Sequence, residues 1–203
     1  PVVDLYSQVS GFGGRGFKEK DKGEVAKYVN TPQTLLYDKS RTLYGLDKAK
    51  VEIRKKDVCI MVEGYVDAIM AFQSGTENVV ATSGTALTTP QLKILKRYSN
   101  NLLTAFDMDV AGDSATKRGI ELAQAQGFNI KVVVMTGGKD PADIVEENPE
   151  SWHSMIEGAK SILQFYFESA FSRFSAQGGS ASGGDALTPE AKREISKILL
   201  PVL

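Results

Sequence analysis

Three short acidic motifs in the middle of the chain contain the residue types that bind divalent cations. They are E-G-Y-V-D at residues 63–67, D-M-D at residues 107–109 and D-P-A-D at residues 140–143. Each motif follows an apolar run that predicts a buried strand. Two carboxylates about 4 Å apart repel each other by roughly 4 kcal/mol at an effective dielectric constant of about 20. If the motifs cluster, protons or a bound metal ion must relieve the repulsion, and oxygen ligands of this kind favour Mg²⁺.

Strand-like and helix-like segments alternate in this region and would position the acids. The apolar, strand-like runs are residues 58–62, 79–81, 102–106 and 130–134. The helix-like segments between them are residues 66–73, 90–98 and 112–126. This alternation predicts βαβ units and a sheet of four parallel strands. Because the carboxyl ends of parallel strands meet at one edge of the sheet, we expect the acids to converge there.

Individual acids in the three motifs have alternative interpretations. Glu63, at the end of the first strand, is predicted to be a metal ligand or a proton-transfer group, with Asp67 one helical turn further on. Asp107 and Asp109 share one face if both continue their strand. Asp140 precedes a proline, which also predicts an ordinary helix N-cap with proline at the first helical position. The loop S-G-T-A-L-T at residues 83–88 offers hydroxyls and amides that could help hold a phosphate at the same edge.

Composition limits the kinds of protein that this chain can be. Its 203 residues are 42% hydrophobic and carry a formal net charge of −1, which is ordinary for a globular protein. The sequence shows neither a membrane span nor a signal peptide, so we expect a cytoplasmic protein without membrane contact. The single cysteine, Cys59, lies in a predicted strand and is expected to be buried. The single histidine, His153, lies outside the acidic motifs, which favours magnesium or manganese over other metals.

The chain is expected to have three parts. Residues 1–50 are rich in glycine and charge and are interpreted as a small subdomain with a tight β-turn at residues 11–16. Residues 51–149 contain the predicted sheet, and residues 150–203 are helical, with a Gly/Ser-rich linker near residues 177–185. Lysine and arginine are frequent in the first part. That is typical either of a nucleic-acid-binding surface or of a solvated, lysine-rich surface.

Several motifs, taken in order, resemble one protein family. E-G-Y-V-D, the S-G-T-A-L-T loop, F-D-M-D-x-A-G at residues 106–112 and D-P-A-D resemble the Toprim domain of bacterial, DnaG-type DNA primases. The upstream motifs resemble the start of the same primases' RNA-polymerase catalytic core; they are G-F-G-G-R at residues 11–15, K-Y-V-N-T-P-Q-T at residues 27–34, Y-D-K at residues 37–39 and L-Y-G-L at residues 43–46. The resemblance implies an α/β fold in which a Toprim (Rossmann-like) parallel sheet is flanked by a small mixed α+β N-terminal subdomain and a helical C-terminal subdomain.

The resemblance implies an enzyme that makes short RNA primers on a DNA template from ribonucleoside triphosphates during DNA replication. Its reaction would be metal-assisted nucleotidyl transfer, with Mg²⁺ or, in its place, Mn²⁺. The positions that match metal-binding acids are Glu63, Asp107, Asp109 and Asp140, of which the first three match catalytic acids. Asp67 and Asp143 match possible accessory acids. The positions that match contacts to nucleic acid or nucleotide are Arg15, Lys27, Asn30, Lys39, Ser83 and Thr85.

The resemblance also implies partners. These are the single-stranded DNA template, ribonucleoside triphosphates, an RNA primer–DNA hybrid, and a replicative helicase that binds through a domain absent here. The family's cysteine-rich zinc module is also missing, so we expect a monomeric catalytic fragment without zinc. In one departure from the family, Ala142 stands where many relatives have the second acid of the last motif. A Toprim-type nuclease and a non-catalytic nucleic-acid-binding module are the alternative functions.

Overall fold

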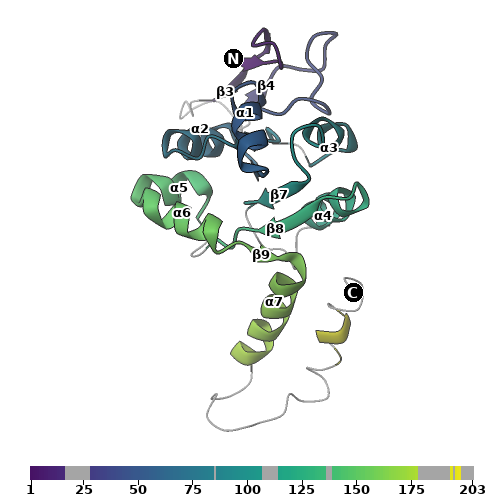
Figure 1. The fold of residues 1–203 in the computed structure, drawn as a ribbon, viewed down its shortest axis with the longest axis vertical. Coiled ribbons are helices and arrows are strands. Elements are labelled where there is room, and N and C mark those ends of the chain that lie inside the picture. The colour runs from purple at the N-terminus through teal and green to yellow at the C-terminus, as the bar shows by residue number, and fades with distance from the viewer. Residues whose placement is uncertain are drawn as a thin grey trace, which may run out of the picture.

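The centre of the molecule is a mixed sheet of five strands in the order β6-β5-β7-β8-β9 (Figure 1). The computed structural model describes residues 1–16, 28–84, 86–106, 114–135, 139–177, 193 and 195–197. The parallel strands are β5 (Cys59–Val62), β6 (Val79–Ala81), β7 (Asn101–Thr104) and β8 (Asn129–Val132). They confirm the four predicted strands. The sheet also has an antiparallel strand, β9 (Lys160–Ser161), which was not predicted because a strand of two residues is too short to give a periodic pattern.

Helices cover both faces of the sheet, because alternate residues of each strand point to opposite faces. In β5, Cys59 and Met61 belong to one hydrophobic cluster, whereas Ile60 and Val62 belong to the other. The first cluster includes residues of α1 (Leu46–Lys56), α3 (Thr89–Leu95), α4 (Ser114–Ala125) and α7 (Ile162–Gln177). The second includes residues of α2 (Tyr65–Gln73), α5 (Pro141–Glu147) and α6 (Pro149–Glu157). The predicted α/β fold is therefore confirmed.

Three of these helices begin at polar caps followed by proline. At α3, Thr88 Oγ1 accepts the Gln91 N–H at 3.2 Å and the Gln91 side chain accepts the Thr88 N–H at 3.0 Å, so the two residues form a capping box. At α5 and α6, the caps are Asp140 and Asn148. A proline fits just after a cap because its missing N–H would have no partner within the helix. These local signals fix where the helices start relative to the sheet.

The N-terminal segment forms two small antiparallel pairs. β1 (Val2–Val3) pairs with β2 (Val9–Gly11), and β3 (Gly13–Arg15) pairs with β4 (Tyr28–Asn30). The tight turn predicted at residues 11–16 is wrong, because these glycines lie within or between strands. An isolated bridge, Tyr44 to Ala81, joins the segment to β6. Helix α1 continues across residue 50, where the sequence analysis placed a domain boundary, and the division into domains stays a prediction.

The C-terminal region is helical as far as it is described. Helices α6 and α7 match the predicted helical segments, and the Trp152 indole N–H in α6 donates to Thr76 Oγ1 at 2.9 Å. Most of the predicted linker and of the last predicted helix lies outside the described residues. Cys59 is buried as expected, and burial raises the pKa of its thiol, which disfavours thiolate chemistry. Within the described part of the chain, no helix is both long and apolar enough to cross a membrane.

Candidate active site at the carboxyl edge of the sheet

The predicted site lies where the strand order of the sheet reverses. β6 lies on one side of β5 and β7 on the other, so the connections diverge between β5 and β7. Open α/β sheets bind ligands outside the carboxyl ends of the strands at such a switch point. Glu63 directly follows β5, whereas Asp107 and Asp109 follow β7 but lie outside the described residues. Lys27 and Thr85 are also outside them.

The end of β5 is tied to the loop that follows β6. The Glu63 carbonyl accepts the N–H groups of Ser83 at 2.9 Å and Gly84 at 3.3 Å, while the residue itself is exposed. Both loop residues have left-handed backbones, with φ of 65° at Ser83 and 76° at Gly84. A non-glycine residue rarely adopts this conformation, so the loop is held in a strained form beside the acid. Ser83 is buried, and its hydroxyl has no hydrogen-bond partner among the described residues.

Asp67 is a buried acid at this edge. Its residue is only 9% exposed, and its Oδ2 accepts the Gly64 N–H at 2.9 Å at the start of α2. Burial raises the pKa of this carboxyl, and the negative charges of Asp140 and Asp143 raise it further. Hydrogen bonds from the Gly64 and Ala142 backbone oppose the rise. The fold therefore brings acids of the first and last motifs into electrostatic contact.

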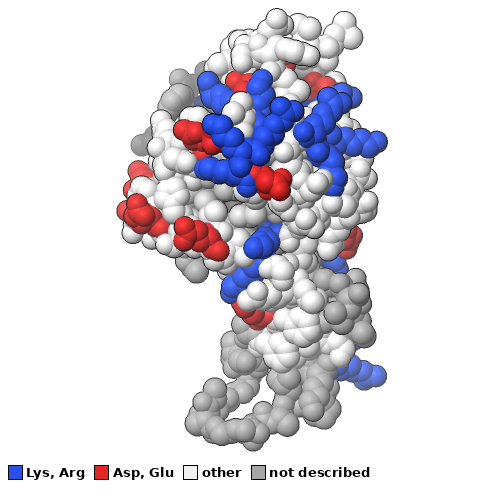
Figure 2. Space-filling model, viewed as in Figure 1, with Lys and Arg blue, Asp and Glu red and all other residues white. Residues whose placement is uncertain are grey.

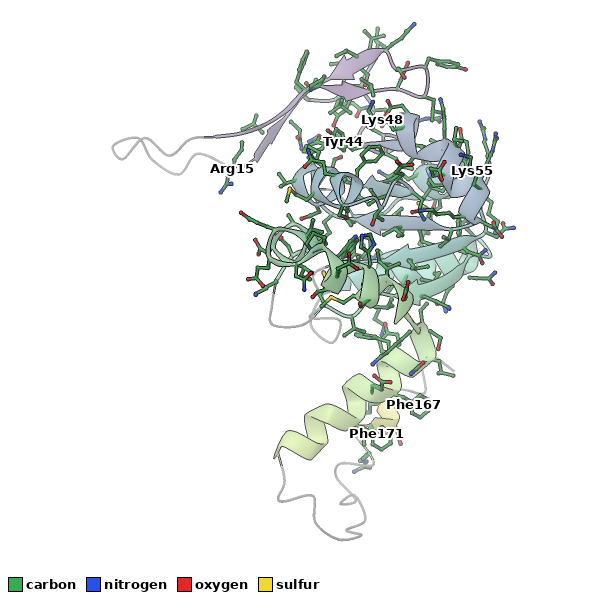
Figure 3. All side chains as sticks on the ribbon, turned by 60° about the vertical axis from the view of Figure 1, so that its left-hand side comes forward. Arg15, Tyr44, Lys48, Lys55, Phe167 and Phe171 are labelled. Carbon is green, nitrogen blue, oxygen red and sulfur yellow. The ribbon has the colours of Figure 1, made fainter. Side chains whose placement is uncertain are left out.

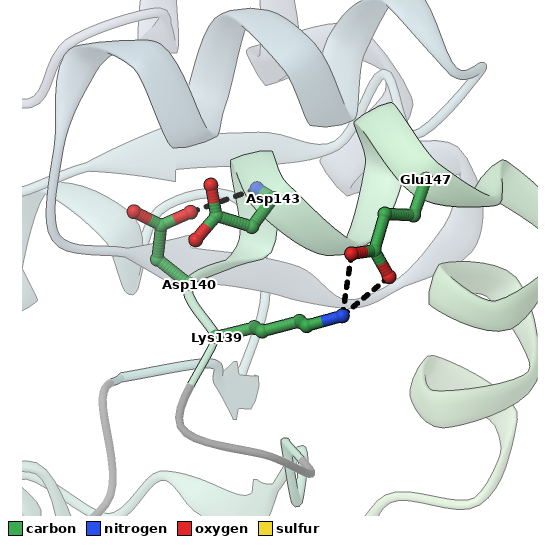
Figure 4. A network of polar contacts seen from close by, with 4 residues as sticks. All are labelled: Lys139, Asp140, Asp143 and Glu147. Atoms are coloured by element: carbon green, nitrogen blue, oxygen red, sulfur yellow. Dashed lines mark hydrogen bonds and ion pairs between the residues drawn. The ribbon is translucent and has the colours of Figure 1, made fainter.

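Asp140 caps helix α5, as the alternative interpretation predicted. Its Oδ1 accepts the Asp143 N–H at 2.8 Å (Figure 4). The neighbouring Lys139 ammonium donates to both carboxylate oxygens of Glu147, one helix length away along α5. Lys139, although it directly precedes Asp140, therefore pairs with Glu147. Capping uses one oxygen of Asp140 and is compatible with a further ligand at the other, so metal binding by this residue stays a prediction.

The donor chemistry at this edge fits a hard divalent cation. Carboxylate oxygens suit Mg²⁺ or Mn²⁺, and the mutual repulsion felt by Asp67 is the kind that a bound cation relieves. Among the residues that the structure describes, no three His, Cys, Asp or Glu side chains form a metal site by themselves. The predicted ligands Asp107 and Asp109 lie outside the described residues, so a metal site at this edge stays a prediction. His153 lies elsewhere, with its Nε2 2.9 Å from the Ser74 carbonyl oxygen.

Asn30 connects the N-terminal segment to the acidic edge. Its Nδ2 donates to the Ser83 carbonyl at 3.3 Å, and its Oδ1 accepts the Tyr65 hydroxyl at 3.0 Å. A carbonyl can only accept, so the amide nitrogen must face Ser83. Both ends of the amide are used by the protein itself, which makes Asn30 a positioning residue in this structure. Its predicted contact with nucleotide stays a prediction.

Two residues in this connection were not predicted from the sequence. Tyr65, at the start of α2, supplies the hydroxyl for Asn30 and packs edge-on against Tyr44 with ring centroids 4.7 Å apart. Gly13 faces Asn30 across the β3–β4 pair, and a Cβ placed there would lie 2.5 Å from Tyr65 Cε2. Gly13 belongs to the motif G-F-G-G-R and Tyr65 to the motif E-G-Y-V-D, so the sequence contains both residues within recognisable motifs. Periodicity alone does not show that these two motifs touch.

The predicted basic residues occupy separate elements. Arg15 is exposed at the end of β3, where Figure 3 shows it projecting from the side of the molecule opposite to Lys55. Lys39 is half-buried, and its backbone is held on both sides: its N–H donates to Gln33 at 3.3 Å and its carbonyl accepts from Gln91 at 3.4 Å. Their contacts with nucleic acid stay predictions.

Comparison with known families identifies the two main parts of the chain. Residues 60–145 match the Toprim-like family, and residues 1–50 match the N-terminal domain of the DNA primase catalytic core. Among curated proteins, the DNA primase of Clostridium acetobutylicum is 41% identical over 172 residues, which cover 84% of this chain and 28% of that protein. A Helicobacter pylori DNA primase is 42% identical over 167 residues, which cover 81% of this chain and 29% of that protein.

Solved structures give the same result. The RNA polymerase domain of Mycobacterium tuberculosis primase DnaG, in complex with a double-stranded DNA oligomer with a 6-nucleotide overhang, aligns with a TM-score of 0.78 at 28% identity, covering 99% of this chain and 62% of that chain. The DnaG primase catalytic domain bound to single-stranded DNA aligns with a TM-score of 0.74 at 29% identity, covering 100% and 62%. The chain spans less than a third of the length of these two curated relatives. It belongs to the bacterial DnaG-type DNA primases and corresponds to part of their catalytic core.

Proposed function

We propose that this chain carries out the catalytic step of DNA-templated RNA primer synthesis during DNA replication. Membership of the DnaG-type primases supports the reaction class. The observation that carries the proposal is the meeting of acids from separate motifs. Glu63 follows β5 and Asp140 follows β8 at the same edge, and the pKa of Asp67 is raised by burial and further by the charges of Asp140 and Asp143. Such a cluster is suited to hold divalent cations beside a triphosphate.

The reaction joins two ribonucleotides by phosphoryl chemistry. The 3′-hydroxyl oxygen of the primer attacks the α-phosphorus of an incoming triphosphate; the new P–O bond forms as the bond to pyrophosphate breaks. The residues that would hold Mg²⁺ are Glu63, Asp107, Asp109 and Asp140. Bound divalent cations would stabilise the negative charge on the attacking and leaving oxygens. Glu63, which is exposed at the end of β5, would accept the hydroxyl proton.

The proposed substrates are the single-stranded template, ribonucleoside triphosphates and the growing RNA–DNA hybrid. Two relatives have been solved with DNA, one with single strands and one with a double-stranded oligomer, which supports template binding by this chain. Arg15, Lys27 and Lys39 would bind phosphates. Asn30 and Tyr65 would keep the strand β4 beside the 83–84 loop, so that the basic segment and the acids keep a fixed relation.

The test is template-directed synthesis by the full-length parent protein and by this fragment, side by side. Each receives single-stranded DNA, labelled ribonucleotides and Mg²⁺. We expect labelled RNA, with weaker synthesis by the fragment. The variant Asp107→Ala with Asp109→Ala should abolish synthesis in both proteins. The control Glu150→Ala with Glu157→Ala removes two exposed acids of α6 and should leave synthesis unchanged.

The alternatives predict different outcomes in the same experiment. A Toprim-type nuclease would shorten the DNA without making RNA. A non-catalytic binding module would do neither, and its response to Mg²⁺ would not depend on Asp107 and Asp109. Mg²⁺ titration followed by thermal unfolding separates these cases, because an ion that binds only the folded state raises the melting temperature. An equal rise in the wild type and in the double variant would overturn the proposed metal site.

A further inference from the structure

A basic groove lies on the face formed by α1, the end of α3 and the turn between β1 and β2. Its volume is about 540 Å³. Figure 2 shows lysine and arginine side chains gathered over α1 and α3. The charged and aromatic residues that line this groove are Tyr6, Lys50, Arg54, Lys55, Arg97 and Tyr98. None of the lining residues is an Asp or a Glu.

Two lysines of the basic groove are paired with groups of the protein itself, and two arginines are exposed. Lys50 Nζ donates to the Leu5 carbonyl at 2.7 Å and so fastens the β1–β2 turn to α1. Lys55 pairs with Glu52 at 2.6 Å on the solvent side of the same helix. Arg54 and Arg97 are both exposed at the groove. The positive charge of the groove therefore exceeds its negative charge, which favours a polyanionic partner.

Aromatic rings accompany these cations. Tyr6 is 85% exposed, at the tip of a turn held by Asp4, whose Oδ1 accepts the N–H groups of Tyr6 at 2.8 Å and Gln8 at 2.9 Å. The guanidinium of Arg54 lies 4.8 Å from the centre of the Tyr98 ring. An exposed ring on a braced turn, beside cations, is the combination with which proteins hold single-stranded nucleic acid: the bases stack and the phosphates pair.

The basic groove is separate from the candidate active site. α1 ends at Lys56, just before β5 begins at Cys59, and Arg97 precedes the start of β7 at Asn101. The groove thus lies near the amino ends of β5 and β7, whereas Glu63 follows the carboxyl end of β5. A strand of four residues spans about 13 Å, so the end of the groove at Lys55 and Arg97 is roughly that far from Glu63. In Figure 3, Lys55 and Arg15 project from opposite sides of the molecule.

We propose that the basic groove binds single-stranded nucleic acid, with Arg54 and Arg97 on its phosphates and Tyr6 stacked on a base. This surface is a second contact, distinct from the template contacts proposed at Arg15, Lys27 and Lys39. Because its recognition uses backbone charge and stacking, it does not depend on base sequence. It would retain a strand on the protein outside the catalytic edge.

Binding of a fluorescent oligothymidylate, followed by anisotropy at several salt concentrations, tests the charge contribution. The measurement uses the full chain without Mg²⁺ or nucleotides, so that a failure of primer synthesis does not affect it. Arg54→Gln with Arg97→Gln should weaken binding on the order of tenfold and lower the slope of log K against log salt by about 1.4, or about 0.7 for each lost phosphate contact. The matched control is Lys131→Gln with Arg193→Gln, two exposed cations that do not line the groove. This control should change neither quantity.

Stacking is tested at Tyr6. Tyr6→Ala should weaken binding roughly tenfold, whereas Tyr6→Phe keeps an aromatic ring and should bind like the wild type. An oligonucleotide that carries 5-iodouracil should form a photo-cross-link to Tyr6 or Tyr98, detected by peptide mapping. Equal affinity and slope for the groove variant and its control, together with cross-links only outside the groove, would overturn the proposal. Displacement of the oligonucleotide by polyglutamate without a cross-link in the groove would instead indicate an acidic polypeptide partner and would also overturn it.

Discussion

The Tyr65 hydroxyl donates a hydrogen bond to Asn30 Oδ1 at 3.0 Å and so joins the first residue of α2 to the last residue of β4. The amide nitrogen of the same asparagine continues the connection to the Ser83 carbonyl. The N-terminal strands are thereby fixed to the start of α2 and to the loop after β6, both at the carboxyl edge of the sheet. This arrangement holds the N-terminal segment and the acidic motifs, which are encoded far apart, in a fixed relation to each other.

Removal of the Tyr65 hydroxyl should loosen this connection. Tyr65→Phe leaves the half-buried Asn30 oxygen without its donor, and we expect the free energy of unfolding to fall by about 1 kcal/mol. Tyr6→Phe is the matched control, because the Tyr6 side chain is 85% exposed. Urea denaturation of both variants measures the difference. Equal midpoints for the two variants would contradict a structural role for the Tyr65–Asn30 bond.

Gly13 and Gly14 form a second matched pair. A Cβ at Gly13 would lie 2.5 Å from a Tyr65 ring atom, whereas a Cβ at Gly14 would meet nothing within 4 Å. Gly13→Ala should therefore destabilise the protein by about 1–3 kcal/mol, since β3 or the ring must move. Gly14→Ala should change stability by less than about 1 kcal/mol. Thermal unfolding of the two variants tests this, and a similar loss in both would refute the steric explanation.

Substitutions of Asp140 can separate helix capping from metal binding. Asparagine keeps an oxygen that can cap α5 but removes the charge, whereas alanine removes both. In metal-free buffer we expect Asp140→Ala to lose about 1 kcal/mol of stability and Asp140→Asn to lose little. Both should weaken the stabilisation by Mg²⁺ and the synthesis of RNA. The control Asn148→Ala, which removes the cap of α6, should lower stability but leave the Mg²⁺ response intact. An unchanged Mg²⁺ response in Asp140→Asn would show that Asp140 acts only as a helix cap.

The raised pKa of Asp67 predicts a specific dependence of stability on pH. Burial, followed by the charges of Asp140 and Asp143, makes the neutral carboxyl more favourable in the folded state than in the unfolded chain. Its contribution to stability is complete below the unfolded pKa and is lost as the pH rises through the folded pKa. Asp67→Asn cannot ionise and can still accept the Gly64 N–H. In metal-free buffer, the wild type should therefore lose stability relative to this variant across that pH window.

Asp38 provides a control of opposite sign. Hydrogen bonds from Ser40 lower the pKa of its carboxyl, so its contribution is present above the unfolded pKa and is lost as the pH falls through the folded pKa. Denaturation midpoints of Asp67→Asn, Asp38→Asn and the wild type, measured from about pH 3 to pH 8 with chelator present, should show opposite trends. The same trend in both variants would contradict the assigned environments.

The parallel sheet and its helices followed from patterns that are local in the sequence. Apolar runs of β-branched residues and proline after a polar cap each encode one element, and the structure bears them out at β5, β6, α3 and α5. The small elements escaped prediction. β9 has two residues. The glycines of β3 read as a turn, and the close approach of Tyr65 explains the missing side chain only at Gly13.

The candidate site was predictable in outline for the same reason. Strand ends of a parallel sheet share an edge, which is enough to group Glu63 with Asp140. The sequence could not show that the side-chain amide of Asn30 accepts a hydrogen bond from Tyr65 and donates one to Ser83, because these bonds depend on how β4 lies against the sheet. Nor could it show that Lys139 turns toward Glu147 and leaves Asp140 to cap its helix.

The bridge between Tyr44 and Ala81 affects how readily the central sheet could add strands from another molecule. Tyr44 exchanges both backbone hydrogen bonds with Ala81, at 2.9 and 3.0 Å, and so covers the outer side of β6. At the other margin of the sheet, β9 offers an incoming chain a strand of only two residues. Long exposed edge strands are templates for aggregation. Here one edge strand of the central sheet, β6, is covered by Tyr44, and the other, β9, is short. Addition of a further strand at these two margins of the central sheet is therefore disfavoured.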